Sequence, residues 1–378
     1  MMQDFLSFLA PVHFLDTQLP ELYNPQQWGH VIYQNRRSLS GYEEADLVLL
    51  GCGEMRSADP DALYSDSPDA VRAAFYKQYC WHPDIRIYDL GNVVEGRTQD
   101  DTRAALRLVL HELYRQGKTV VVLGGTHDLM LQQYEVYKLE STTANVVVAD
   151  MRIDLDEDPD VSPHTFLYEL LTGQPNYVRH YSHLGFQSYA THPHTLETLD
   201  KLRFDFFRLG WLRESIEEAE PVLRQADVFG FDMTAVRFGD APANVGGSPN
   251  GFSGEEACAL ARYAGMSERL ESFGLYGWEP THDRMGMTAQ LVAQMLWYFI
   301  DGLSLRKTEA ELSNRAQFAE FPVVMNEHHS LFLKSRRTGR WWMQLPNQKF
   351  IPCSYTDYKT ALSDQLPERW LREQERLV

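Results

Sequence analysis

Five side chains that can bind a metal ion closely follow apolar runs of the sequence. They are His127, Asp150, Asp154, Asp232 and Glu279. Imidazole nitrogen together with carboxylate oxygen is a donor set of manganese, zinc and iron sites, and the set contains no thiolate that would favour a softer metal. A single aspartate after a strand is usually a helix N-cap or a loop anchor, so the prediction of a metal site depends on the whole set.

The elements expected to carry these side chains alternate between apolar runs and amphipathic stretches. One amphipathic stretch, residues 100–117, has apolar residues at helical spacing and ends at Gly117, a residue type suited to a helix C-cap. The alternation predicts a mostly parallel sheet with helices on both faces, whose strands end at one edge. Runs typical of buried strands cover residues 45–51, 85–91, 119–125, 145–150, 204–210, 226–232 and 273–279.

The alternation stops at about residue 304. Residues 304–317 are typical of a charged helix, and residues 321–346 of a β-hairpin that turns at the TGR sequence. The chain from Pro352 onward has an irregular pattern until a short final helix at residues 367–377. This part is therefore expected to be an appendage to the sheet.

Length and composition indicate a folded chain with one large domain and an addition. The chain has 378 residues, of which 44% are hydrophobic, enough for a sizeable core. We divide it into an α/β domain, residues 1–303, and a C-terminal extension, residues 304–378, packed on that domain. The longest apolar run of the C-terminal third, residues 291–303, is too short to span a bilayer.

Charge and cysteine content limit the partners and the compartment. The formal net charge is -18 and lysine and arginine form no dense cluster, so nucleic acid and anionic membrane are poor partners. The four cysteines lie far apart and form no CxxC pair, so the sequence indicates neither a thiolate zinc site nor a disulfide framework. A reduced, cytoplasmic setting fits this composition.

Six segments, in order, resemble motifs of the arginase or ureohydrolase superfamily, and the sequence is most similar to the formimidoylglutamase branch. The resemblance runs from about residue 46 to 303. It implies a three-layer α/β/α fold, a binuclear manganese cluster, hydrolysis of a guanidino or amidino C–N bond by a metal-bridging hydroxide, and a homo-oligomer. The segments are GCGEMRS with SPDAVRAAFY, LGGTHD, ADMRID, FGFDMTAVR, GSPNGFSGEEA and EPTHDRMGMTAQLVAQMLWYFIDG.

The resemblance also implies which residues would bind each metal. The four ligands of the first metal are all present, as His127, Asp150, Asp154 and Asp232. The second metal would share Asp150 and Asp232, but the positions of its own two ligands hold Arg152 and Thr234. We therefore predict at most one bound ion, manganese or zinc, and no second metal site.

Arg152 lies midway between Asp150 and Asp154, so a positively charged side chain stands between two predicted metal ligands and requires an explanation. Arginine stays protonated and has no lone pair for a metal, so it cannot replace a ligand. We expect its guanidinium to replace the second metal itself, by donating hydrogen bonds to Asp150 and Asp232. With Arg152 counted, the three aspartates leave a charge of about -2, which one divalent ion cancels. Arg237 would add another positive charge if it pointed inward.

Other positions bear on the substrate and on the orientation of the ligands. Glu279 matches the family glutamate that meets the cationic amidine of the substrate, and Asn250 lies in the glycine-rich loop expected to contact it. Thr126 replaces an acid of the family that could orient the metal-binding histidine. His164 lies where some members keep a proton-shuttling histidine, although we favour a histidine of a loop or helix start. The expected catalytic residues are thus Asp150, Arg152 and Glu279.

Two functions are compatible with this pattern. The first is a divergent protein of the superfamily whose hydrolase activity is weak or lost and which acts by binding or assembly. Its C-terminal extension, with Trp341, Trp342 and Trp370, would provide an additional surface for a partner protein. The second is an active mononuclear hydrolase of formimidoylglutamate or a related amidine, in which Asp150 and Glu279 assist. A small amidine or guanidine ligand is expected in either case.

Overall fold

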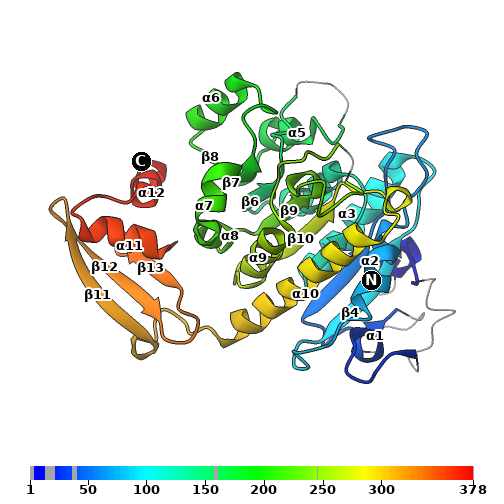
Figure 1. Cartoon of the computed structure of the whole chain (residues 1–378), viewed down its shortest axis with the longest axis horizontal. Coiled ribbons are helices and arrows are strands. Elements are labelled where there is room, and N and C mark those ends of the chain that lie inside the picture. Colours follow the sequence, from blue (N-terminus) through cyan, green and yellow to red (C-terminus); the bar gives the residue numbers. More distant parts are fainter. Residues whose placement is uncertain (1–3, 13–21, 36–40, 157–160, 245, 378) are drawn as a thin grey trace.

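A large, mostly parallel sheet and a small antiparallel sheet organise the molecule. The computed structural model describes residues 4–12, 22–35, 41–156, 161–244 and 246–377. The large sheet has ten strands in the order β1-β4-β3-β5-β10-β9-β6-β7-β8, with β2 also paired to β4 (Figure 1). Strand β1 is antiparallel to β4, and the other pairings of this sheet are parallel.

The bounds of these strands follow from apolar runs in the sequence. Five of them, β3, β5, β6, β9 and β10, are buried along their whole length, which is typical of parallel strands covered on both faces. The strands are β1 (Leu9–Ala10), β2 (Tyr33–Gln34), β3 (Leu47–Gly51), β4 (Ile87–Val93), β5 (Thr119–Leu123), β6 (Ala144–Ala149), β7 (Val178–Phe186), β8 (Asp205–Arg208), β9 (Val228–Asp232) and β10 (Ser272–Tyr276).

Helices cover both faces of the large sheet, and short 3-10 helices follow several strand ends. The α-helices of this part are α1 (Trp28–Val31), α2 (Ser67–Phe75), α3 (Gln99–Arg115), α4 (Met130–Glu140), α5 (Phe166–Thr172), α6 (Pro193–Lys201), α7 (Leu209–Glu214), α8 (Ala219–Leu223), α9 (Gly254–Gly265) and α10 (Met287–Thr308). The 3-10 helices are η1 (Asp4–Phe8), η4 (His127–Leu129), η5 (Ile216–Glu218), η6 (Met233–Ala235), η7 (Pro280–His282) and η8 (Arg315–Gln317).

Alternation along each strand divides the core in two. Successive side chains of a strand point to opposite faces, so Val121 and Val120 of β5 belong to different cores. The core that contains Val121 is closed by residues of α2, α9 and α10, and the core that contains Val120 by residues of α3, α4 and α5. This arrangement confirms the predicted three-layer α/β/α fold.

The predicted strands are all present within a few residues of their expected bounds, but one long strand was not predicted. Strand β7 has the sequence VRHYSHLGF, in which polar residues interrupt the apolar pattern. It is nevertheless a strand between β6 and β8, and its second half is buried. Two of its polar side chains, Ser182 and His183, are buried because the surrounding structure supplies them with partners and packing that a local pattern cannot show.

The C-terminal part differs in detail from the prediction. Helix α10 runs without a break across the expected boundary at 303/304, and the expected charged helix ends with it at Thr308. The predicted hairpin is part of a four-stranded antiparallel sheet, and α11 was not predicted. The elements are β11 (Phe318–Met325), β12 (His328–Ser335), β13 (Trp341–Gln344), β14 (Phe350–Cys353), α11 (Tyr355–Leu362) and α12 (Glu368–Leu377).

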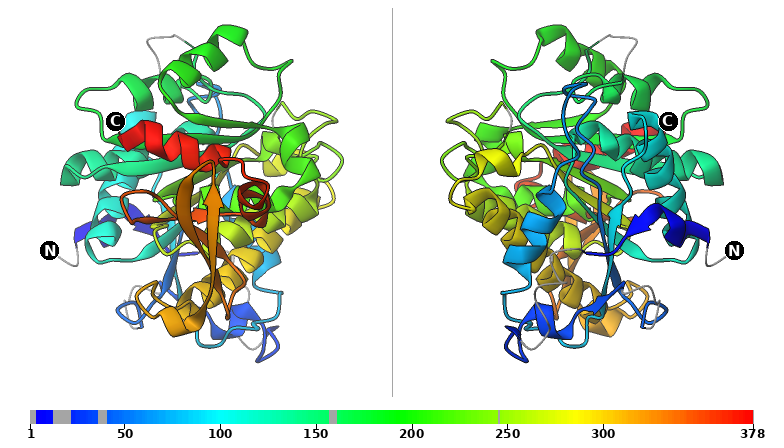
Figure 2. Two further views of the ribbon diagram at one scale, coloured as in Figure 1. Left: turned by 90° about the vertical axis from the view of Figure 1, so that its left-hand side faces the viewer. Right: turned by 90° about the vertical axis from the view of Figure 1, so that its right-hand side faces the viewer.

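The three tryptophans of this part do not form a surface. Trp341, Trp342 and Trp370 are only 5 to 7% exposed, and they pack within the small cores on either side of the small sheet. The expectation that they offer a surface to a partner is therefore wrong. The extension is a folded layer that lies against one side of the α/β domain (Figure 2).

Ion pairs hold the last helix to the edge of the large sheet. Arg372 and Arg376 of α12 lie 3.1 and 2.6 Å from the two carboxylate oxygens of Asp205 on β8. His180 of β7 lies 2.9 Å from the same carboxylate.

Within the described part of the chain, no helix is long and apolar enough to cross a membrane.

Candidate metal centre

Neighbouring strands end level with one another and bring acidic side chains to one edge of the sheet. Ala149 of β6 pairs with Phe231 of β9, and Asp232 at the end of β9 pairs with Tyr276 of β10. Asp150 follows Ala149 directly and therefore lies beside Asp232. The parallel register thus places together two aspartates that are 82 positions apart in the sequence.

A tight turn after β5 delivers His127 to the same place. Gly124 and Gly125 have φ angles of +84° and +78°, which side chains with a Cβ rarely adopt. A Cβ on Gly125 would lie 2.3 Å from the side chain of Leu129. The turn ends at η4, whose first residue is His127, and this side chain is 1% exposed.

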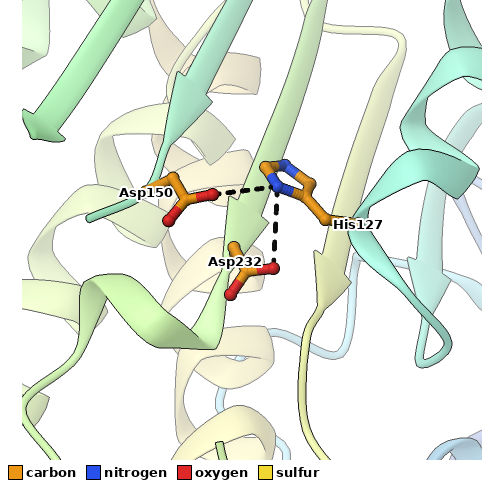
Figure 3. A group of neighbouring side chains, drawn as sticks. All are labelled: His127, Asp150 and Asp232. Carbon is orange, nitrogen blue, oxygen red and sulfur yellow. Dashed lines mark hydrogen bonds and ion pairs between the residues drawn. The ribbon is translucent and has the colours of Figure 1, made fainter. Parts of the chain in front are cut away.

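One nitrogen of His127 faces three carboxylates, of which Figure 3 shows those of Asp150 and Asp232. Its Nδ1 lies 3.1 Å from Oδ2 of Asp150, 3.5 Å from Oδ2 of Asp154 and 3.6 Å from Oδ2 of Asp232. Two ligands that are each about 2.1 Å from one metal ion lie roughly 3.0 to 3.4 Å apart. The spacing and the donor types of His127, Asp150 and Asp232 therefore fit a single divalent ion. Asp154, the fourth predicted ligand, lies close to the same nitrogen but is not part of this mutually close group.

Burial and mutual repulsion make this cluster attract positive charge. Burial by itself lowers the pKa of His127, but hydrogen bonding to Asp150 and Asp154 and the negative charge of Asp232 outweigh it and raise the pKa to about 10. Burial, followed by the charge of Asp150, raises the pKa of Asp232 to about 6. Burial and the charge of Asp154 also raise the pKa of Asp150. The cluster therefore favours a proton on His127, and a divalent ion bound at the same point would replace that proton.

The outer oxygens of the two bridging aspartates are bonded to donors of the protein. The hydroxyl of Thr234 donates to Oδ1 of Asp150 over 2.6 Å, and the backbone N–H of Arg152 donates to the same oxygen over 3.1 Å. The backbone N–H of Thr234 donates to Oδ1 of Asp232 over 2.7 Å. These are the two oxygens that face away from the inner ligands, and protein donors already occupy them.

The guanidinium of Arg152 does not have the expected position. Its Nη2 lies 3.3 Å from Oδ2 of Asp156, and the two side chains are 39% and 62% exposed. Its contact with Asp150 is made by the backbone N–H alone among the described hydrogen bonds. The expectation that the guanidinium replaces a second metal between Asp150 and Asp232 is therefore wrong, because the loop after β6 directs the side chain outward to Asp156.

The formal charge of the metal site therefore differs from the value predicted with Arg152 included. Arg237 also points away, with Nε 2.9 Å from Oδ2 of Asp240 and a 43% exposed side chain. Without either guanidinium, the three aspartates contribute -3, which one divalent ion reduces to -1 and two ions change to +1. Charge therefore does not decide between one ion and two, whereas the donors on the outer oxygens favour one.

A buried polar network lies beneath His127 and was not predicted. The hydroxyl of Thr126 lies 2.7 Å from that of Ser57, which donates to Oδ1 of Asp128 over 2.7 Å. Arg103 of α3 lies 2.6 Å from the other oxygen of Asp128. Asp128 is thus an acid two residues after Thr126, but it does not orient His127, whose Nε2 has no hydrogen-bond partner among the described residues. The charged residue inside the LGGTHD motif is the signal that could have indicated it.

A second unpredicted contact holds Asp150 from below. The ring of His183 on β7 lies 3.0 Å from the backbone carbonyl of Asp150 through Nε2 and 2.7 Å from the hydroxyl of Tyr181 through Nδ1. Burial lowers the pKa of His183 to about 4, so the ring is neutral. Since the carbonyl can only accept, Nε2 carries the proton and the hydroxyl of Tyr181 donates to Nδ1. His183 lies on β7, a strand that the local sequence pattern did not predict, so this contact was not predicted either.

Three further predicted residues lie in loops that follow strands of the large sheet. His164 lies with Nδ1 3.6 Å from Oδ1 of Asp154 and is 58% exposed, so the structure does bring it to the metal ligands. Glu279 lies just beyond β10, where its carboxylate caps η7 through the backbone N–H of Thr281. Asn250 is exposed in the loop before α9, and its carbonyl accepts from Gln187.

Comparisons with known proteins agree with this architecture. A sequence model described as the arginase family matches residues 46–301. The structure is similar to that of Trypanosoma cruzi formiminoglutamase with Mn2+, with a TM-score of 0.64 and 16% identity over 70% of this chain and 95% of that chain. No curated protein sequence matches the chain.

Two other solved structures have the same fold. The formimidoylglutamase of Bacillus subtilis has a TM-score of 0.62 and 18% identity, over 69% of this chain and 88% of that chain. The agmatine ureohydrolase of Thermoplasma volcanium has a TM-score of 0.59 and 18% identity, over 77% of this chain and 99% of that chain.

Proposed function

The chain belongs to the arginase family, and we propose that it binds one divalent ion, manganese or zinc, and has weak or no activity as a C–N hydrolase. His127, Asp150, Asp154 and Asp232 would hold the ion. The fold match to a formiminoglutamase whose structure contains Mn2+ supports manganese as the first metal to test.

The observation that carries the proposal is the hydrogen bond from Thr234 to Asp150. This hydroxyl donates to Oδ1 of Asp150, the oxygen that a second ion would need, over 2.6 Å. Neither Thr234 nor Arg152 offers the imidazole or carboxylate that a second manganese would require. A second ion would therefore have to displace protein donors from Asp150 and Asp232 and would gain no strong ligand in exchange.

Loss of the second ion reduces what the site can contribute to hydrolysis. A bound divalent ion lowers the pKa of a coordinated water and polarises the group under attack, and paired ions do so more strongly than one. Glu279 would still contribute to substrate binding, because it lies at the same edge of the sheet and can contact a cationic amidine. Arg152 is outside this arrangement, because its guanidinium binds Asp156.

A second candidate function is an active mononuclear hydrolase of an amidine or guanidine such as formimidoylglutamate. His164 favours it, because an exposed imidazole 3.6 Å from Asp154 lies where a proton could pass between the site and solvent. The complete set of four inner ligands favours it as well. In this case Asp150 and Glu279 would assist and Thr234 would hold Asp150 in position.

Metal analysis and a product assay on the same preparation separate the two functions. The full chain, loaded with manganese or with zinc and then freed of excess metal, is assayed for metal per chain and for release of urea, formamide and ammonia. One ion per chain without turnover supports the proposal, and one ion with turnover supports the mononuclear hydrolase. Two ions per chain in the wild type would contradict both, and so would a chain that retains none.

Matched variants locate the ion. Asp154→Asn removes one carboxylate that faces Nδ1 of His127 and is expected to weaken metal binding, whereas Asp200→Asn, on the exposed face of α6, is expected to leave it unchanged. From family membership we also propose a homo-oligomer, and from the separated cysteines a cytoplasmic setting. Sedimentation of the full chain tests the oligomer.

A further inference from the structure

A cleft separates the C-terminal helices from the edge of the α/β domain. It has a volume of about 720 Å³ and is lined by residues of β8 and α7 on one side and of α11 and α12 on the other. Small-molecule sites have volumes of about 300 to 1,000 Å³ and often lie between packed units. No lining residue belongs to the metal centre, so the cleft is a separate feature.

One wall of the cleft presents an aromatic surface. The rings of Phe207 and Trp211 are stacked, with centroids 5.4 Å apart and an interplanar angle of 23°. Phe207 covers one face of the indole, yet Trp211 remains 46% exposed. A large aromatic ring that is held in place on one side and open on the other is suited to stacking or to a cation.

The arginines of the opposite wall are already neutralised. Arg369 lies 3.1 Å from Asp357 and 3.4 Å from Glu218. Arg372 and Arg376 both bind the carboxylate of Asp205. These three side chains of α12 therefore bind acids of the protein and do not form a free anion site.

Asp205 and Glu218 of the first wall are the partners of these arginines, so one acid of that wall, Glu214, stands apart from them. The Oε2 of Glu218 lies 3.4 Å from Arg369, while its Oε1 is a buried atom without a hydrogen-bond partner among the described residues. Glu214 lies three positions after Trp211, so both project from the same side of α7. Glu214 forms no ion pair within the described part of the chain, and Arg208, which likewise forms none there, is exposed at the rim.

We infer that this cleft binds a small organic cation that places its charged group between Trp211 and the carboxylate of Glu214. A cation held against an aromatic face is stabilised by the ring, and the effect increases when water is excluded. The formal net charge of -18 attracts cations and disfavours anions over the whole surface. An apolar body next to the charge is favoured by the aromatic wall that Phe207 extends.

Choline and its neutral isostere 3,3-dimethyl-1-butanol provide the test. The two molecules have nearly the same shape and differ in charge, so titration calorimetry on the full chain separates the role of charge from that of apolar packing. We expect saturable binding of choline and roughly 3- to 30-fold weaker binding of the isostere. Trp211→Leu and Glu214→Gln are each expected to weaken choline binding by a similar factor.

Two control variants test whether the loss of choline affinity is specific to the cleft. Trp81→Leu changes an exposed tryptophan outside the cleft, and Glu217→Gln changes an exposed glutamate of η5 that does not line it. Both are expected to bind choline like the wild type. The inference is overturned if choline does not bind up to about 10 mM, if the isostere binds equally well, or if the controls lose as much affinity as the cleft variants.

Discussion

The hydroxyl of Thr234 donates a 2.6 Å hydrogen bond to Oδ1 of Asp150. This bond joins the ends of two neighbouring strands, β6 and β9, at the point where a second ion would have to bind. It satisfies one buried carboxylate oxygen, while the other oxygen of Asp150 faces His127. One oxygen of the aspartate thus faces the candidate metal position, and the other is bonded to the protein.

Restoring the missing ligands should restore the second ion. The double change Arg152→His and Thr234→Asp replaces a cation and a hydroxyl with an imidazole and a carboxylate, and we expect one additional manganese per chain by elemental analysis. The matched control, Arg152→Lys with Thr234→Ser, keeps the charge and the hydroxyl and should bind no more metal than the wild type. If the first variant also gains no metal, the assignment of these two positions is wrong.

A methyl group at Gly277 should disturb the metal centre. Gly277 has a φ of +82°, and an added Cβ would lie 2.4 Å from both carboxylate oxygens of Asp232. Gly277→Ala is therefore expected to shift this ligand and to weaken manganese binding roughly 10- to 100-fold, as measured by titration calorimetry. Gly117→Ala, which has a φ of +66° and open space around it, tests for strain alone. Equal affinity in both variants would contradict the prediction.

Removal of Arg72 should strongly destabilise the fold. This residue lies in the SPDAVRAAFY segment, is fully buried, and bonds both carboxylate oxygens of Asp89 at 2.8 and 2.9 Å. Arg72→Ala leaves a buried carboxylate without its cation, and we expect a loss of about 3 to 5 kcal/mol in the free energy of unfolding. Arg86→Ala breaks an exposed pair with Glu44 and should cost at most about 1 kcal/mol in the same urea titration.

The attachment of α12 should weaken in acid. Burial by itself raises the pKa of Asp205, but hydrogen bonding to His180 and the charges of His180 and Arg376 outweigh it and lower the pKa below the ordinary value. Because the folded pKa is below the unfolded value of about 3.9, the carboxylate stabilises the fold above that pH. This stability is lost as the pH falls from about 4 towards the folded pKa.

Thermal unfolding of Asp205→Asn measures this effect. The variant should unfold at a lower temperature than the wild type near neutral pH, since Arg372 and Arg376 lose a charged partner. The difference should shrink as the pH is lowered below about 4. A difference of the same size at pH 7 and at the lowest pH where both chains fold would contradict the assignment of this carboxylate.

Local patterns in the sequence were sufficient for the architecture and for finding the residues of the candidate metal centre. Buried parallel strands are continuous apolar runs, and helices between them have their own spacing, so each element could be recognised from its own residues. His127, Asp150 and Asp232 follow such runs directly. Their meeting at one edge then follows from the parallel order of the strands. The motifs that resemble the arginase family pointed to the same residues.

Only the tertiary structure decided what depends on partners from distant segments. The direction of Arg152 was expected to be inward, yet Asp156 binds it outside, and the donor on Asp150 is the hydroxyl of Thr234. Strand β7 was missed because polar residues interrupt its apolar pattern, and the partner of its buried His183 is the backbone carbonyl of Asp150, just after β6. A sequence shows which groups are present, but the direction of a polar side chain depends on which partner lies within reach after folding.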